Sequence, residues 1–140
     1  RLGRDLGMAF QIADDLKGSF WASADSGKAA AGDIRKRKKT YPVVWAMRNA
    51  AATDVARLIA IYQPRIRATD GSGPPAGDMP MSDELTDEVL DILERSGARE
   101  ATEQEARRYR DLALVEARSL PVPVEGVEDL RALVESMISA

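Results

Sequence analysis

The chain opens with the apolar pattern of an amphipathic α-helix. From Leu2 to about Trp21, apolar residues recur at three- and four-residue steps, and no proline interrupts the run. The residues that set this period are Leu2, Leu6, Ala9, Phe10, Ala13 and Leu16. Because such a helix has to cover its apolar face, we expect this segment to pack against another part of the fold.

A polar face borders the apolar face of the same helix. Its members lie three or four positions apart: Gln11, Asp14, Asp15 and Gly18. Two carboxylates beside an apolar surface repel each other and lose hydration unless a cation neutralises them. Mg²⁺ prefers oxygen ligands and is commonly held by one or two carboxylates together with phosphate oxygens. The pair therefore indicates a metal site, with an ordinary solvated Asp-Asp as the alternative.

Cations follow the carboxylate pair at two places. The segment from Ser23 to Gly32 is rich in Ser, Ala and Gly and is predicted to be a loop, with Lys28 in its middle. Gly27 lets the backbone approach a ligand closely, and the Lys28 ammonium is a point charge suited to phosphate. A plain surface loop is the alternative reading of this Gly-Lys pair.

A run of five cations, Arg35 to Lys39, comes next, directly after Asp33 and Ile34. Such a run suggests a nucleic-acid patch. The whole chain, however, carries 20 Lys plus Arg against 23 Asp plus Glu, a net charge of -3, and lacks the interleaved aromatic residues of a nucleic-acid module. We therefore exclude nucleic acid as a partner and interpret Arg35, Lys36 and Arg37 as a solvated charge run.

In order and spacing, these segments resemble the second aspartate-rich region of the trans-isoprenyl diphosphate synthases, the polyprenyl synthetase family. The matching residues are the run from Phe10 to Asp15, Gly27-Lys28, Asp33, Lys38, Thr40 and Pro42. Further along, the run from Leu93 to Ala98 and a long charged helix with Tyr109 and Ala113 are similar to the C-terminal helices of that family. The resemblance implies an all-α fold, the C-terminal part of an isoprenoid-synthase helical bundle.

The resemblance also implies a metal site. It gives Asp14 and Asp15 the role of holding Mg²⁺ against the diphosphate of the allylic substrate, and places Asp33 near a metal-bound water. Many family members carry a third aspartate where this chain has Gly18. Mg²⁺ binding is therefore expected from two carboxylates of the first helix rather than three.

Substrates and reaction follow from the same resemblance. Gln11, Lys28 and Lys38 are implied to surround the allylic diphosphate, and Lys28 to act in catalysis with Asp14 and Asp15. The implied activity is a Mg-dependent trans-prenyltransferase that condenses isopentenyl diphosphate with an allylic prenyl diphosphate. Products of the family are geranyl, farnesyl, geranylgeranyl and longer prenyl diphosphates. We also expect a homodimer, because the few helices of this chain would leave part of the apolar core uncovered and prone to association.

The chain departs from the family in lacking its other aspartate-rich motif, since Asp14-Asp15 is the single Asp-Asp in the sequence. We therefore expect residues 1–140 to be one helical domain, the C-terminal portion of a longer prenyltransferase, and to be inactive alone. A non-catalytic regulatory subunit of a prenyltransferase is one alternative. A class I terpene cyclase is another, although the Gly-Lys and Lys-x-Thr-x-Pro patterns argue against it.

Composition limits the side chains that are available for catalysis, disulfides and metal binding. The chain has no cysteine and no histidine, which excludes disulfides, thiolate sites, imidazole catalysis and His-ligated zinc. Carboxylates and cations must carry any reaction. No apolar run approaches the length of a membrane span and no signal-peptide pattern is present, so we expect a cytoplasmic protein.

The remaining sequence predicts further helices and no strand. Helical spacing continues from Pro42 to Pro64 with a break near Thr53-Asp54, and residues 70–80 are predicted to form a flexible loop. Ser82 is expected to cap the following helix and Gly97 to end it.

Two more helices complete the prediction. The helix from about Ala98 ends before Pro121 and is expected to be peripheral, because its apolar stripe is thin: Tyr109, Leu112, Ala113 and Ala117. Residues 127–138 form a last amphipathic helix, whose apolar face serves either packing or a partner.

Overall fold

The computed structural model describes residues 1–20, 31–63, 80–121 and 123–139, and within these ranges the fold is entirely α-helical. The helices are α1 Leu2–Phe20, α2 Gly32–Arg35, α3 Tyr41–Asn49, α4 Ala52–Tyr62, α5 Asp83–Ser96, α6 Ala98–Arg118 and α7 Val124–Ser139. Lys28, Trp21 and residues 70–79 of the expected loop lie outside the described residues. The all-α prediction is confirmed.

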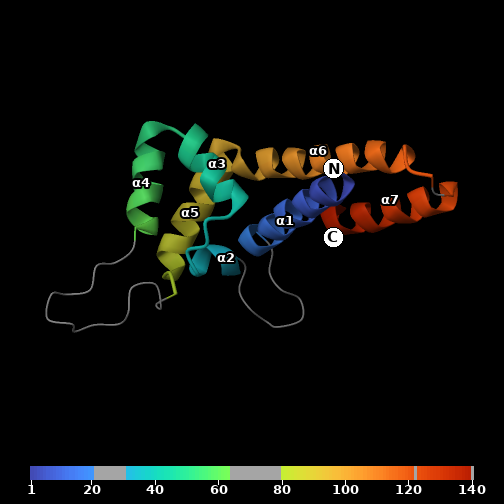
Figure 1. The fold of residues 1–140 in the computed structure, drawn as a ribbon. Helices are drawn as coiled ribbons and strands as arrows, with labels where there is room; N and C mark the ends of the chain where they lie inside the picture. Colours follow the sequence, from blue (N-terminus) through green and yellow to red (C-terminus); the bar gives the residue numbers. More distant parts are fainter. Residues whose placement is uncertain (21–30, 64–79, 122, 140) are drawn as a thin grey trace, which may run out of the picture.

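The long helix α6 connects two groups of helices. Figure 1 shows α3, α4 and α5 at one end of α6, and α1 and α7 along its other part. One core lies among α3, α4 and α5 and includes Ile34 of α2; the second joins α1, α6 and α7 through Ile12, Ala13, Ala106 and Val134. The amphipathic face predicted for the opening helix is therefore largely buried against α6 and α7, but Phe10, which we assigned to it, is 38% exposed.

The prediction that the helix after Gly97 is peripheral is wrong. In the described chain, the contact between α6 and α1 is more extensive than the contact between any other two helices. Its buried stripe consists mainly of small residues: Ala98, Thr102, Ala106, Ala113, Leu114 and Ala117. Small side chains allow a neighbouring helix to approach closely, but they give a weak apolar signal in a sequence. Leu112, which we assigned to the stripe, is 40% exposed.

The helix ends follow local sequence signals. The side-chain oxygen of Ser82 accepts a hydrogen bond from the N–H of Leu85 at 3.3 Å, and Gly97 ends α5 with a φ of 84°. The break expected near Thr53-Asp54 occurs slightly earlier, at Ala50 and Ala51, which are both extended. Asp54 then lies in the first turn of α4, where the helix dipole favours a negative charge.

Among the described residues, no helix combines the length and the apolar character that crossing a bilayer requires.

Candidate functional site

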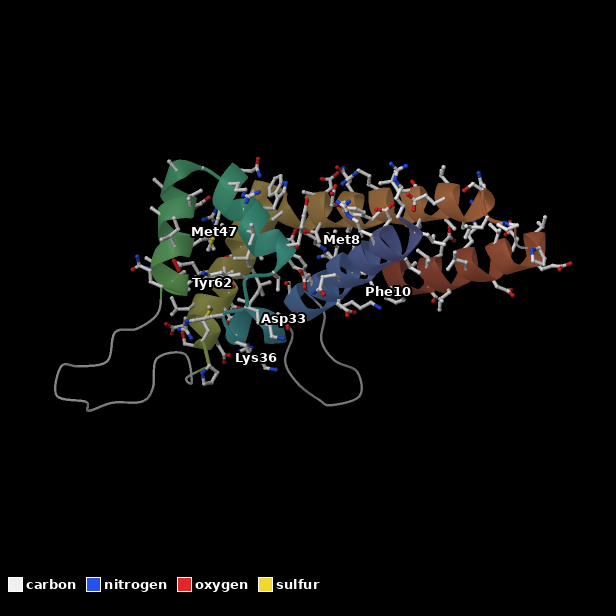
Figure 2. All side chains as sticks on the ribbon, in the orientation of Figure 1. Met8, Phe10, Asp33, Lys36, Met47 and Tyr62 are labelled. Atoms are coloured by element: carbon white, nitrogen blue, oxygen red, sulfur yellow. The ribbon has the colours of Figure 1, made fainter. Side chains whose placement is uncertain are left out.

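An open pocket of about 480 Å³ lies beside the C-terminal half of α1, α2 and the segment that leads into α3. It is lined by Gln11, Asp14, Asp15, Gly18, Asp33, Lys38, Lys39 and Thr40. Figure 2 shows Asp33 on α2, close to the end of α1. The structure thus brings together every site residue predicted from the sequence that it describes; Lys28 is the one that lies outside the described residues.

Helix α1 supplies the two adjacent carboxylates. Ile12, Ala13 and Leu16 are buried on the opposite side, which leaves Asp14 exposed and Asp15 half-buried. The Gln11 side-chain amide donates a hydrogen bond to Oδ1 of Asp15 at 3.3 Å. Gln11 therefore helps to orient one member of the carboxylate pair.

The other oxygen of Asp15 reaches across to α3. The backbone N–H of Tyr41 donates to Oδ2 of Asp15 at 2.9 Å. Tyr41 is the first residue of α3, so its N–H is one of those that the helix leaves unsatisfied. Asp15 thus links α1 to α3 as well as lining the pocket.

The side chain of Tyr41 helps to hold this link in place. It packs against the core formed by α1, α6 and α7. Burial, followed by the nearby carboxylate of Glu105, raises the pKa of the Tyr41 phenol above its ordinary value of 10.0. The phenol therefore stays neutral at neutral pH.

A third carboxylate and a cation come from the segment between α1 and α3. Asp33 lies on α2, with its side chain 21% exposed, and its Oδ1 is 3.5 Å from Nζ of Lys38. The N–H of Lys38 also donates to the backbone carbonyl of Asp33 at 2.9 Å. Between them, Arg37 has a φ of 55°, so a left-handed turn brings Lys38 back beside Asp33.

The interpretation of Arg35, Lys36 and Arg37 as a solvated run is correct for Lys36 alone. Arg35 forms an ion pair with Asp83 in α5, and the Nε of Arg37 donates to the carbonyl of Ile61 in α4 at 3.3 Å. Both side chains are half-buried, whereas Lys36 is exposed. Charge runs are usually solvated, but these two arginines attach the site segment to α4 and α5.

Two hydroxyl groups join the end of α1 to the start of α3. The side-chain oxygens of Ser19 and Thr40 lie 3.2 Å apart in a hydrogen bond, and both residues are buried. Because Thr40 also lines the pocket, this contact fixes one wall of the site. The sequence signal was the position of Thr40 in the family motif; nothing in the sequence indicated its partner.

The oxygen donors of the pocket suit a hard divalent cation whose remaining ligands are phosphate oxygens and waters. Three carboxylates, of Asp14, Asp15 and Asp33, line one pocket together with the ammonium groups of Lys38 and Lys39. Across the described part of the chain, no three metal-ligating side chains gather closely enough to hold a metal ion by themselves. Mg²⁺ usually keeps several waters and phosphate oxygens in its shell, so this donor set suits it.

Comparisons with known sequences identify relatives of this chain. Residues 1–71 match the polyprenyl synthetase family. The chain is 28% identical over 136 residues to (2E,6E)-farnesyl diphosphate synthase of Mycobacterium tuberculosis, covering 97% of the chain and 35% of the relative. It is 32% identical over 139 residues to nonaprenyl diphosphate synthase of the same organism, covering 99% of the chain and 37% of the relative. The chain therefore spans little more than a third of the length of these relatives.

Solved structures show the same arrangement of helices. A polyprenyl synthetase from Streptomyces coelicolor superposes with a TM-score of 0.76 at 29% identity, covering 98% of this chain and 38% of that chain. A geranylgeranyl pyrophosphate synthase from Corynebacterium glutamicum, complexed with calcium and isoprenyl diphosphate, gives a TM-score of 0.70 at 29% identity, over 99% of this chain and 38% of that chain. From its sequence and its fold, the chain belongs to the polyprenyl synthetase family.

Proposed function

We propose that this chain binds the allylic substrate in a trans-prenyltransferase that condenses isopentenyl diphosphate with an allylic prenyl diphosphate. The observation that carries the proposal is a pocket in which carboxylates and cations from α1, α2 and the following segment meet. Homodimeric assembly and a cytoplasmic location stay predictions, since both rest on the sequence alone.

Each side chain has a role in this proposal. Asp14 and Asp15 would hold Mg²⁺, with Asp33 acting through a bound water. Lys38 and Gln11 would bind the oxygens of the diphosphate, together with Lys28. When bound, Mg²⁺ supplies positive charge that neutralises the diphosphate as it departs.

The reaction begins when the allylic carbon–oxygen bond breaks and its electron pair leaves with the diphosphate. The Lys38 side chain lines the pocket, where its ammonium would stabilise this negative charge. The double bond of isopentenyl diphosphate then forms a new carbon–carbon bond to the allylic cation. Loss of a proton from the resulting cation regenerates a double bond and gives the elongated allylic product.

The test is an assay of the native protein that carries this chain. Labelled isopentenyl diphosphate is supplied with geranyl or farnesyl diphosphate and Mg²⁺, and the products are separated by chain length. Elongated prenyl diphosphates are expected, and chelation of the metal should stop their formation. A parallel reaction without isopentenyl diphosphate detects a terpene cyclase, which would release a hydrocarbon from the allylic substrate alone. Absence of elongated product would overturn the proposal.

A further inference from the structure

Two residues other than glycine have a left-handed backbone in the described ranges, and they lie on either side of α2. Ala31 has a φ of 68° and Arg37 a φ of 55°. A side chain makes this conformation unfavourable, so such a residue persists there only where surrounding contacts hold it. Ala31 is buried in the core, whereas Arg37 is half-buried. The turn at Arg37 therefore depends on the contacts of its own side chain.

The side chain of Arg37 extends to the end of α4. Its Nε donates a hydrogen bond to the backbone carbonyl of Ile61 at 3.3 Å. Ile61 lies in the last turn of α4, where carbonyls have no partner within the helix. That turn carries no basic residue of its own, so Arg37 supplies the positive charge that a helix C-terminus favours. Because Ile61 and Tyr62 are both buried in the core, the accepting carbonyl belongs to a well-packed part of the fold.

The backbone of Arg37 sets the position of Lys38. The N–H of Lys38 donates to the carbonyl of Asp33 at 2.9 Å, and its Nζ lies 3.5 Å from Oδ1 of Asp33. Lys38 and Asp33 both line the pocket, and Arg37 does not. Arg37 thus directs its neighbour into the pocket while its own side chain contacts α4.

We infer that Arg37 is a positioning residue of the diphosphate pocket: its guanidinium, bound to the carbonyl of Ile61, holds the left-handed turn that places Lys38 at the site. Without the guanidinium, the turn keeps its unfavourable backbone and loses the contact that offsets it. Lys38 then moves away from Asp33. The inference rests on the proposed function for the role of Lys38 in binding diphosphate, but not for the turn itself.

Hydrogen exchange tests the turn in the native protein. Mass spectrometry follows deuterium uptake in the peptide that contains Lys38, whose N–H closes the turn. We expect Arg37→Ala to speed exchange by about 10- to 100-fold, because a hydrogen bond from a charged donor is lost. Arg37→Gly should exchange more slowly than Arg37→Ala, because glycine adopts the left-handed turn without steric cost. Lys36→Ala is the matched control, since it removes one charge from the same run, and it should exchange as the wild type does.

Binding of Mg²⁺ with inorganic pyrophosphate, measured by titration calorimetry, tests the consequence for the pocket. Arg37→Ala should weaken binding by about 10-fold, as is typical of groups that orient ligands from outside the site, and Lys36→Ala should not. If Arg37 acts through Lys38, the double variant Arg37→Ala/Lys38→Ala binds no more weakly than Lys38→Ala alone. In the prenyl-transfer assay, Arg37→Ala should raise the KM of the allylic substrate and leave that of isopentenyl diphosphate unchanged.

The inference is overturned by wild-type exchange in Arg37→Ala, by exchange in Arg37→Gly as fast as in Arg37→Ala, or by additive binding losses in the double variant. Equal increases in the KM of both substrates would also overturn it, because they would indicate a general disturbance. Failure of the wild type to bind Mg²⁺ with pyrophosphate would instead overturn the proposed function, and hydrogen exchange would still decide whether Arg37 holds the turn.

Discussion

The carboxylate of Asp15 is tied to the backbone of Tyr41, with 2.9 Å between Oδ2 and the amide nitrogen. Asp14, its neighbour in the sequence, is exposed. The two adjacent aspartates therefore differ in what they contribute. Asp15 accepts a hydrogen bond from the first N–H of α3 and places negative charge at the positive end of that helix. Asp14 does not make this contact with α3.

Replacement of the two aspartates should separate activity from stability. Asp14→Asn is expected to lower turnover on the order of 100-fold, because a carboxylate that would hold Mg²⁺ against the departing diphosphate is lost, and to leave the unfolding free energy nearly unchanged. Asp15→Ala should also lower the unfolding free energy by about 1 kcal/mol, since α3 loses its capping acceptor. Asp15→Asn is the matched control, because its amide oxygen still accepts from Tyr41.

Steady-state kinetics at saturating Mg²⁺ and urea unfolding of the same samples measure both quantities. Wild-type turnover in Asp14→Asn would contradict the metal assignment. Equal stability of Asp15→Ala and Asp15→Asn would contradict the capping role.

A different prediction concerns the cations of the pocket. Lys38 is 58% exposed and pairs with Asp33, so its ammonium can turn toward a ligand. Lys38→Ala and Lys28→Ala should each weaken binding of the allylic substrate much more than that of isopentenyl diphosphate. A lost charge-assisted contact corresponds to roughly 1.5–3 kcal/mol of binding free energy. Lys36→Ala is the control, because Lys36 is exposed and does not line the pocket.

The measurement is the KM of each substrate for every variant. Equal losses for the two substrates in Lys28→Ala would show that Lys28 acts indirectly, and the same result in Lys38→Ala would show this for Lys38.

Local patterns in the sequence were enough to predict the parts of the site that lie on one element. The spacing of Gln11, Asp14 and Asp15 on a single helix predicted their common face, and the pocket contains all three. The contact of Asp15 with Tyr41 joins residues 26 positions apart, and no local pattern encodes it. The family resemblance carries such long-range information, and through it Asp33 and Lys38 were named as neighbours of the carboxylate pair, whereas Lys39, which also lines the pocket, was not predicted.

The error over α6 has a different physical origin. Helix α6 packs closely on α1 through alanines such as Ala106. These small side chains let the two helices approach each other, but they bury little apolar area. A sequence pattern weighs large apolar residues and so undervalues such a helix.

The buried hydroxyl pair of Ser19 and Thr40 should be energetically coupled. Thr40→Val removes one partner and leaves the Ser19 hydroxyl buried without a hydrogen bond, which costs about 1–3 kcal/mol of unfolding free energy. The double variant Ser19→Ala/Thr40→Val should lose less than the sum of the two single losses. Chemical denaturation of the four proteins gives the coupling. Strictly additive losses would show that the two hydroxyls contribute independently.

Acid should weaken the contact between α4 and α5. The guanidinium of Arg95 donates hydrogen bonds to both carboxylate oxygens of Asp54, and this holds the pKa of Asp54 below its ordinary value of 3.8. The folded state therefore binds this proton less readily than the unfolded state. The stability gained is complete above the ordinary pKa and is lost as the pH falls through the lower, folded value.

Urea midpoints measured from about pH 7 down to about pH 3 should fall less steeply in Asp54→Asn than in the wild type. Parallel curves for the two proteins would contradict a contribution of Asp54 to acid sensitivity.

The 140 residues alone are expected not to catalyse prenyl transfer. Asp14-Asp15 is the single Asp-Asp of the sequence, and nowhere in the described ranges do three metal-ligating side chains lie close enough to hold a metal ion. One such pair holds too few Mg²⁺ ions to neutralise the departing diphosphate. The test assays the purified 140-residue chain with isopentenyl and farnesyl diphosphates and Mg²⁺, beside the complete product of its reading frame. Robust elongation by the isolated chain would refute this prediction. A complete product that binds Mg²⁺ with pyrophosphate but elongates nothing would favour a regulatory subunit instead.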